Sequence, residues 1–375
     1  MTEGKVEGAY VKRSSRWKII LAALVLALVL TIIVSLGVGY ASSPHKDMAL
    51  PPITFLQILY ILGKQIPLVG NSINSSGIFV SPSAQASAQA IIILIRLPRV
   101  LAAALVGAGL AAAGVIYQGV FRNPMADSYL LGASAGASVG YTIAVLYVSS
   151  ALTLVGMGIA QVFAFVFAIL TVFVVLFMSR VGTKIPVTTL LLSGIVVNIF
   201  LLAIETLMEL HSGQALTGIV AWLAGGFSSI VWLQVWAVIP FVFIGITITY
   251  FFTRDLNMLS MGDETAHHLG VNTERVRQIL LVVASMMTAA AVAISGVIGF
   301  VGLIIPHMTR LVIGPDHRIL LPASAIVGAM FLVICDAVAR VATGASELPV
   351  GVITALVGTP FFIYLLRRRK TTYSL

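Results

Sequence analysis

Apolar runs of bilayer length recur along the whole chain, and they constrain the fold more than any other feature. A helix that crosses the hydrocarbon core of a membrane needs about 20 mostly apolar residues. Only 9% of the residues are charged, whereas soluble domains carry about 25%. We therefore predict an all-α, polytopic membrane protein with about ten transmembrane helices, at 19–40, 95–119, 129–149, 157–179, 187–208, 232–252, 278–297, 299–313, 320–339 and 349–366.

The first apolar run, residues 19–38, follows a basic arm. A secretory signal is the alternative for this segment, but the apolar region of a signal is about 7–15 residues long. This run has 20 residues and no clear small-residue cleavage site, so we predict a retained span. The organisation that follows is a cytoplasmic arm over 1–18, a transmembrane domain over 19–370 and a tail over 371–375.

Lysine and arginine indicate how the spans are oriented, because cytoplasmic loops carry an excess of both. With the N-terminus inside, 17 of the 22 basic residues fall on the cytoplasmic side and five on the outer side. This bias places both termini in the cytoplasm and the protein in the cell membrane. It also explains the net charge of +9 without nucleic acid as a partner. The longest outer loop, 41–92, contains an amphipathic stretch, ITFLQILYILGK, followed by a Ser/Gln-rich stretch that we expect to be flexible.

Three of the five outer basic residues are arginines at the ends of spans: Arg96, Arg99 and Arg340. One interpretation is that they extend toward lipid headgroups. The other is a partner that presents carboxylates, because the planar guanidinium binds a carboxylate with two parallel hydrogen bonds. Asp336 precedes Arg340 by one helical turn, so these two residues can also pair with each other.

The one long cytoplasmic connection is RDLNMLSMGDETAHHLGVNTERVR, residues 254–277. Its glycines predict two short helices with a glycine turn after the first. Such a segment is either a docking surface for another protein or an ordinary polar connection. The candidate docking residues are Gly262, Asp263, Glu264, Ala266, His267, His268, Leu269 and Gly270.

The stretch GASAGASVG places Gly132, Gly136 and Gly140 at four-residue spacing, which allows another helix to approach closely. The same letters match the G-x-S-x-G nucleophile pattern around Ser134, and His307 lies in another span. An intramembrane serine protease is therefore an alternative function. That motif requires a strand–turn–helix setting, whereas this segment lies in a predicted helix, so we favour helix packing.

Asn198 and Glu205 are seven residues apart in the span 187–208, and two helical turns place them on one face. Ionisable groups inside a membrane usually mark a pathway or an interhelical hydrogen bond. We predict that these two side chains line a translocation path.

Motifs for metal or nucleotide chemistry are missing from the sequence. His267 and His268 are adjacent, so on a helix their side chains point about 100° apart and form a poor metal pair. No G-x-x-x-x-G-K-[ST] loop occurs, so ATP that drives this protein has to bind another polypeptide. We expect no metal site and no cofactor.

Four long stretches together resemble the FecCD-type permeases, the membrane subunits of type II ABC importers for iron–siderophore complexes, haem and cobalamin. They are RLPRVLAAALVGAGLAAAGVIYQGVFRNPMADSYLLGASAGAS, GDETAHHLGVN, SGVIGFVGLIIPHMTRLVIGPDHRILLP and ELPVGVITALVGTPFFIYLLRRR. The resemblance covers nearly everything from Ile53 to Lys370. The N-terminal arm and an insertion at 64–92 depart from it.

The resemblance implies a homodimer with ten spans per subunit and a translocation path between the subunits. It implies two ATPase subunits on the cytoplasmic side and one substrate-binding protein on the outer side. Arg96, Arg99 and Arg340 match positions that meet glutamates of the binding protein, and Gly262–Gly270 matches the coupling helices that contact the ATPase. The segment HSGQALTGIVAWLAGGFSSI matches the gate region.

From this resemblance we predict the permease subunit of an importer for a metal chelate. The substrate that we favour is an iron–siderophore complex or haem. Cobalamin and molybdate or tungstate are alternatives within the family. A secondary transporter, which needs no ATPase, is an alternative of another class, as is the serine protease. A cytoplasmic docking segment favours the importer over both.

Overall fold

The computed structural model describes residues 3–38, 54–65, 78–79, 81–148, 153–154, 157–182, 184–343 and 347–370. Nearly all of these residues are helical, and the only strands among them are the two-residue pair β1 (Thr153–Leu154) and β2 (Met157–Gly158). The helices are α1 (Glu3–Gly37), α2 (Phe55–Lys64), α3 (Pro82–Ala90), η1 (Ile91–Arg96), α4 (Leu97–Val120), η2 (Ser128–Leu131), α5 (Ala133–Tyr147), α6 (Ile159–Met178), α7 (Val187–Leu210), η3 (Gly213–Ala215), α8 (Leu216–Leu223), α9 (Trp232–Phe251), α10 (Thr253–Ser260), α11 (Asp263–His268), α12 (Thr273–Ser295), α13 (Val301–Ile313), α14 (His317–Val341) and α15 (Val350–Lys370).

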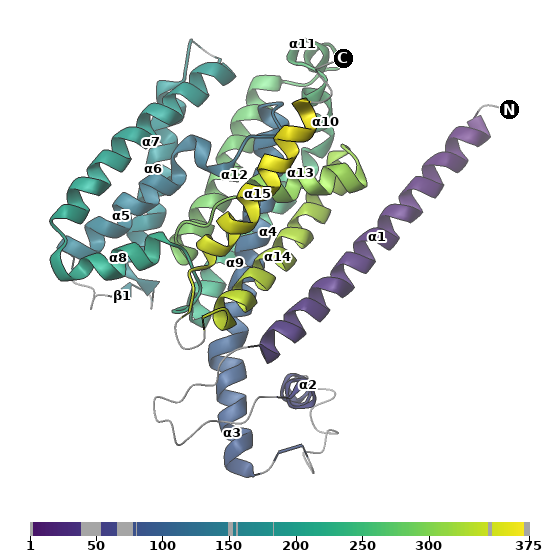
Figure 1. Cartoon of the computed structure of the whole chain (residues 1–375). Helices are drawn as coiled ribbons and strands as arrows, with labels where there is room; N and C mark the ends of the chain where they lie inside the picture. The colour runs from purple at the N-terminus through teal and green to yellow at the C-terminus, as the bar shows by residue number, and fades with distance from the viewer. Residues whose placement is uncertain are drawn as a thin grey trace.

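All ten predicted spans are occupied by helices: α1, α4, α5, α6, α7, α9, α12, α13, α14 and α15. Among the described residues, seven helices are long and apolar enough to cross a membrane, and α5, α13 and the start of α15 are shorter apolar helices. The all-α, polytopic fold predicted from the sequence is confirmed. The helices run roughly side by side, and both chain ends lie at the end of the bundle that carries α11 (Figure 1). We call this the α11 end and the opposite one the α2 end.

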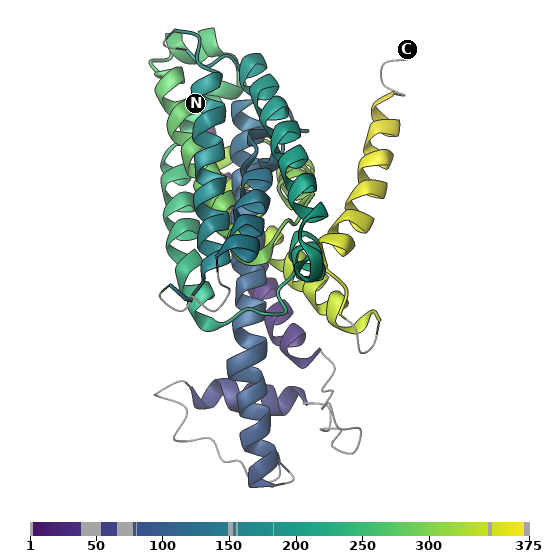
Figure 2. The same ribbon diagram turned by 90° about the vertical axis from the view of Figure 1, so that its left-hand side faces the viewer.

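The first two spans are longer than predicted. α1 begins at Glu3, so the predicted arm continues the first span as a helix. α3, η1 and α4 form one rod over residues 82–120 that projects beyond the bundle at the α2 end (Figure 2). The expectation of a flexible Ser/Gln-rich segment is wrong over residues 82–90, because Ser81 caps this helix by accepting a hydrogen bond from the Ala84 amide, followed by proline at the first turn. Residues 66–77 and 80 of the predicted insertion and the tail 371–375 lie outside the described residues.

A π-helical turn, η1, interrupts this rod and ends two residues before Pro98. Proline has no amide hydrogen and its ring clashes with the carbonyl one turn earlier, so a helix that continues through proline has to widen or kink. The widened turn leaves the Ile93 carbonyl to accept a hydrogen bond of 2.8 Å from Trp232 Nε1 on α9.

α2 lies outside the bundle and crosses the rod near α3 (Figure 2). Thr54 and Gln57 form a capping box at its start. Ile58, Tyr60 and Ile61 are buried in a cluster that includes Leu36 at the end of α1. The amphipathic stretch predicted in the outer loop is thus a helix that packs on the ends of the first two spans.

α4 is the centre of the bundle and is buried along most of its length, with α12, α13 and α14 around it. Two glycines of α4 make this possible. A Cβ atom on Gly107 would collide with the carbonyl of Gly328 on α14, and one on Gly114 would collide with the carbonyl of Gly302 on α13. Helices in lipid associate by such close packing because the hydrophobic effect does not drive them together.

Candidate functional site

The α11 end of the bundle presents a short helical unit made of α10 and α11. Gly262 separates the two helices at a φ of 121°, a conformation that glycine adopts without strain. Ala266 anchors α11 in the core, whereas Glu264, His267, His268 and Leu269 are exposed. The two short helices and the glycine turn predicted for this segment are confirmed. Exposed Met261 and Leu269 beside these polar groups give the surface the mixed character of a protein interface.

Arg277 on α12 ties α11 to the bundle. Its side chain is 6% exposed, and its Nη2 atom donates to both carboxylate oxygens of Asp263, at 2.9 and 3.0 Å. Its Nη1 atom lies 3.3 Å from Glu274, one turn earlier on the same helix. The position of α11 is therefore set by hydrogen bonds to a charged group, which are stronger than neutral ones.

Asn257 ties α10 to a different span. Its amide nitrogen donates to Asp316 at 2.9 Å, and its amide oxygen accepts from the His317 backbone at 2.9 Å. Asp316 caps the start of α14, so α10 is fastened to the first turn of that span. A groove of about 600 Å³ lies beside α11, lined by Lys184, Asp263, Glu264, His267, Gly270, Val271, Asn272, Thr273 and Glu274.

The α2 end of the bundle holds the three arginines that the sequence placed at the outer mouth. The structure brings them together, but it buries them: Arg96 is 6% exposed, Arg99 is 7% and Arg340 is 4%. Arg99 Nε and Arg340 Nε lie 2.8 and 3.2 Å from the two carboxylate oxygens of Asp336, which is fully buried. The three guanidinium groups are therefore buried at this end of the bundle, and the pairing predicted between Asp336 and Arg340 is confirmed.

The remaining donors of these arginines hold the end of α1. Arg96 donates to the Leu36 carbonyl at 2.7 Å, and Arg340 donates to the Val38 carbonyl and to Ser35 Oγ, each at 2.6 Å. The last carbonyls of a helix lack partners within it and carry the negative end of its dipole. Arg96 and Arg340 therefore cap α1.

Among the described carboxylates that pair with these arginines, Glu347 is the one that reaches the surface. Arg99 Nη1 donates to both of its oxygens, at 2.8 and 3.0 Å, and the Glu347 side chain is 42% exposed. We call Arg96, Arg99, Arg340, Asp336 and Glu347 the arginine cluster. Among the residues that the structure describes, the pair between Arg99 and Glu347 is the only ion pair of this cluster that is half-exposed.

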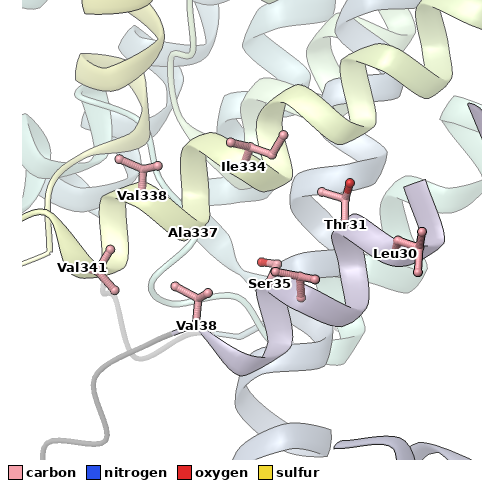
Figure 3. A pocket seen from close by; sticks show the side chains of 9 residues that line it. Leu30, Thr31, Ser35, Val38, Ile334, Ala337, Val338 and Val341 are labelled. Carbon is pink, nitrogen blue, oxygen red and sulfur yellow. The ribbon is translucent and has the colours of Figure 1, made fainter. Parts of the chain in front are cut away.

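A groove of about 460 Å³ lies beside the arginine cluster, between α1 and α14 (Figure 3). Thr31 and Ser35 are the only lining residues with a polar side chain. Thr31 donates to the Ala27 carbonyl at 2.8 Å, and Ser35 accepts from Arg340. A small-molecule site needs polar groups that orient the ligand, so this groove suits a lipid chain and not a polar chelate. It is lined by Leu30, Thr31, Val34, Ser35, Val38, Ile334, Ala337, Val338 and Val341.

α7 carries both residues predicted for the translocation path. Asn198 donates to the Tyr129 carbonyl in η2 at 3.1 Å, so its amide holds two parts of the chain together. Glu205 is buried, and its Oε1 atom has no hydrogen-bond partner among the described residues. Both side chains turn away from the exposed apolar face of α7, which presents Leu192, Ile195, Val196, Ile199, Phe200 and Leu202.

The glycine stripe lies where α5 meets α6. A Cβ atom on Gly136 would collide with Thr171 Oγ1, and one on Gly140 would lie 2.5 Å from the Phe163 carbonyl. Gly132, at a φ of 77°, joins η2 to α5 and lies near Thr171 and Asn198. Because a 3₁₀ helix and not a strand precedes Ser134, the geometry of a nucleophile elbow is missing there.

Among the described residues, no group of three or more His, Cys, Asp or Glu side chains could hold a metal ion. The two ends of the bundle, a docking-type surface and a buried charge cluster, are therefore its chemically distinctive parts. The FecCD transport family matches residues 27–368, which is most of the chain. The chain belongs to this family.

Individual relatives are similar in sequence to this FecCD chain over about three quarters of its length. The cobalamin import system permease protein BtuC of Halobacterium salinarum is 46% identical over 284 residues, which are 76% of this chain and 75% of the relative. The hemin transport system permease protein HmuU of Yersinia pestis is 38% identical over 277 residues, 74% of this chain and 83% of the relative. A solved structure described as a metal-chelate type ABC transporter in an inward-facing conformation matches with a TM-score of 0.74 and 31% identity, covering 93% of this chain and 99% of that one.

Three residues of these sites, Glu347, Glu274 and Arg277, were not predicted from the sequence. Glu347 lies 248 positions from Arg99, so no local spacing indicates the pair. Glu274 and Arg277 are three residues apart at the start of α12, which is the spacing of a helical ion pair. From that spacing alone, an ion pair beside the docking segment could have been predicted.

Asp336→Asn tests whether the arginine cluster is a structural element of the FecCD fold. We expect the variant to lose about 3–5 kcal/mol of unfolding free energy, because two buried arginines lose the charge that they share. Thermal and denaturant unfolding in detergent micelles measures the loss. Glu347→Gln is the matched control, for which the half-exposed position predicts a loss below about 1 kcal/mol. Equal losses in the two variants would contradict the assignment.

Proposed function

We propose that this chain is the membrane-spanning permease subunit of an ATP-driven importer for a metal chelate. It works as a homodimer in the lipid bilayer of the cell membrane, with two cytoplasmic ATPase subunits and an extracytoplasmic substrate-binding protein. Its membership of the FecCD family supports the class, and relatives named for cobalamin and hemin import support the kind of substrate. Hydrolysis of ATP belongs to the separate ATPase, so the permease itself is a transport subunit and not an enzyme.

The single observation that carries the proposal is the helical unit α10–α11. It is exposed and is fastened to two spans of the bundle, α14 and α12, which suits a surface that receives force from a partner. An ordinary polar connection needs none of these ties. We assign the ATPase contact to the exposed part of Gly262–Gly270, where Glu264, His267, His268, Leu269 and Gly270 face outward and Asp263 and Ala266 hold α11 in place.

The charge distribution supports the orientation. Both chain ends lie at the α11 end. When the spans are followed along the sequence, 17 of the 22 basic residues fall on the same side of the membrane as the chain ends. The positive-inside rule then makes the α11 end cytoplasmic and the α2 end extracytoplasmic. ATP is available on the cytoplasmic side, which is the side where the ATPase has to dock.

The exposed apolar face of α7 supports a dimer with the path between subunits. Only 22% of its apolar window is buried, although α7 is one of the longest helices in the bundle. Pairing of two such faces would bury them and enclose a path, with α8 across its outer end as the gate region. Glu205 is directed away from that face, and its role as a path residue stays a prediction. The hydrogen bond from the Asn198 side chain to the Tyr129 carbonyl in η2 favours a structural role for Asn198.

We propose that the binding protein docks on the arginine cluster. Carboxylates of the partner reach Arg99 by exchange with Glu347, which already occupies the half-exposed side of that guanidinium. Arg96 and Arg340 act beneath it, because their donors are used to hold the end of α1. This modifies the prediction from the sequence, in which all three arginines contact the partner.

ATP-driven uptake into proteoliposomes tests the function. We expect the permease with its ATPase and binding protein to take up one member of a panel of cyanocobalamin, haemin, a ferric hydroxamate siderophore and molybdate. Uptake should require both ATP and the binding protein, and it identifies the chelate. Uptake without the ATPase would favour a secondary transporter, and peptide cleavage that Ser134→Ala abolishes would favour a protease.

Glu347→Gln tests the docking site. The variant leaves Arg99 Nη1 without its charged partner, so we expect the binding protein to bind about two- to fivefold more tightly, the range of one exposed ion pair. Affinity is measured on nanodisc-embedded permease at low and high salt. Glu209→Gln, the same charge change elsewhere on the chain, is the control. Weaker binding by Glu347→Gln would contradict the exchange.

A further inference from the structure

The start of α7 is fastened to the docking segment through one carboxylate. Glu274 Oε1 accepts a hydrogen bond of 2.9 Å from the backbone amide of Ile185. Ile185 is buried and lies two positions before Val187, where α7 begins. The other oxygen of Glu274 pairs with Arg277, which in turn holds Asp263 on α11. An unbroken set of polar contacts thus runs from α11 to Ile185, two residues before α7 begins.

The connection before α7 is short and stiff, so a pull on Ile185 moves the helix. Val181 and Lys184 exchange backbone hydrogen bonds of 3.0 and 3.2 Å around Gly182, which makes a tight turn. Pro186 then fixes the backbone directly before α7, because its φ is locked by the ring. Little slack remains between the amide of Ile185 and the axis of α7.

α10 is attached to α14 and not to α7, so only α11 is connected to the start of α7 by the contacts described here. Asn257 on α10 holds Asp316 and His317 at the start of α14. α14 and α7 are thus reached by separate contacts from one docking unit. α14 ends at the arginine cluster, whereas α7 carries the exposed face assigned to the path.

We propose that Asp263, Arg277 and Glu274 form a relay that transmits displacement of α11 to the start of α7. Glu274 is the central positioning residue, because it alone joins the guanidinium to the Ile185 amide. The inference rests on the proposed docking of the ATPase at α11. The relay adds to that proposal a hydrogen bond, between the Glu274 carboxylate and the Ile185 amide, through which α7 is moved in addition to side-chain packing.

The test compares Glu274→Ala with Glu274→Gln in the full-length permease. Glutamine keeps an oxygen that accepts from the Ile185 amide, whereas alanine removes it. Hydrogen exchange of segment 181–187 in nanodiscs requires no ligand. We expect exchange to become about tenfold faster in Glu274→Ala, as for the loss of a charged hydrogen bond, and to change little in Glu274→Gln.

Coupling is measured on the same variants as panel ligand taken up per ATP hydrolysed, with cyanocobalamin, haemin and a ferric hydroxamate siderophore as probes. Glu274→Ala should bind the ATPase as the wild type does but move about tenfold less ligand per ATP. Glu274→Gln keeps the contact with the Ile185 amide but loses the charge that pairs with Arg277, so its ratio should lie between those of Glu274→Ala and the wild type. Arg275→Gln, an exposed neighbour on α12, is the control and should leave both exchange and ratio unchanged.

Several results would overturn the relay. A wild-type ratio in Glu274→Ala despite faster exchange at 181–187 would show that the contact does not transmit motion. Loss of ATPase binding in Glu274→Ala would make Glu274 a docking residue. Equal loss of coupling in Glu274→Ala and Glu274→Gln would assign the effect to the ion pair alone. A wild-type permease that binds no ATPase would refute the proposed function itself, and this failure is distinguishable because it needs no variant.

Discussion

Close approach of helix backbones at glycine is the interaction on which the rest of this bundle depends. α4 contacts α14 through Gly107 and Gly328 and α13 through Gly114 and Gly302, with no room for a Cβ atom between them. Lipid provides little hydrophobic drive for helix association, so such contacts replace the large side chains of a soluble core. They leave α1, α6 and α7 on the outside, where their apolar faces are available to lipid or to a second subunit.

The ion-pair networks described above lie at the two ends of this frame, and the long helices connect one end with the other. α14 starts at the Asp316 cap that holds α10, and near its other end it carries Asp336 and Arg340 of the arginine cluster. α12 starts with the Glu274–Arg277 pair that holds α11. An importer that responds to a binding protein on one side and to ATP on the other requires rigid elements of this kind, and the two ends of α14 lie at both proposed contacts.

The spans were predictable because length and hydropathy decide them, and nine of the ten begin and end within about five residues of the helices observed. The glycine turn at Gly262 was predictable from local chemistry. The burial of the arginines was not, because Arg99 finds Asp336 and Glu347 at separations of 237 and 248 residues. The widened turn in the rod 82–120 could have been predicted from Pro98. The helix over 82–90 could not, because its residues are mostly small and polar and lack an apolar helical pattern.

Site-directed cross-linking tests most directly the claim that α11 receives the ATPase. Cys335, the only cysteine in the chain, is replaced by alanine, and one new cysteine is introduced by His267→Cys or Tyr147→Cys. Both positions are exposed, the first on α11 and the second at the end of α5. With the assembled complex, the account predicts a cross-link to the ATPase from position 267 and none from position 147. A cross-link from 147, or an intact complex with none from 267, would contradict it.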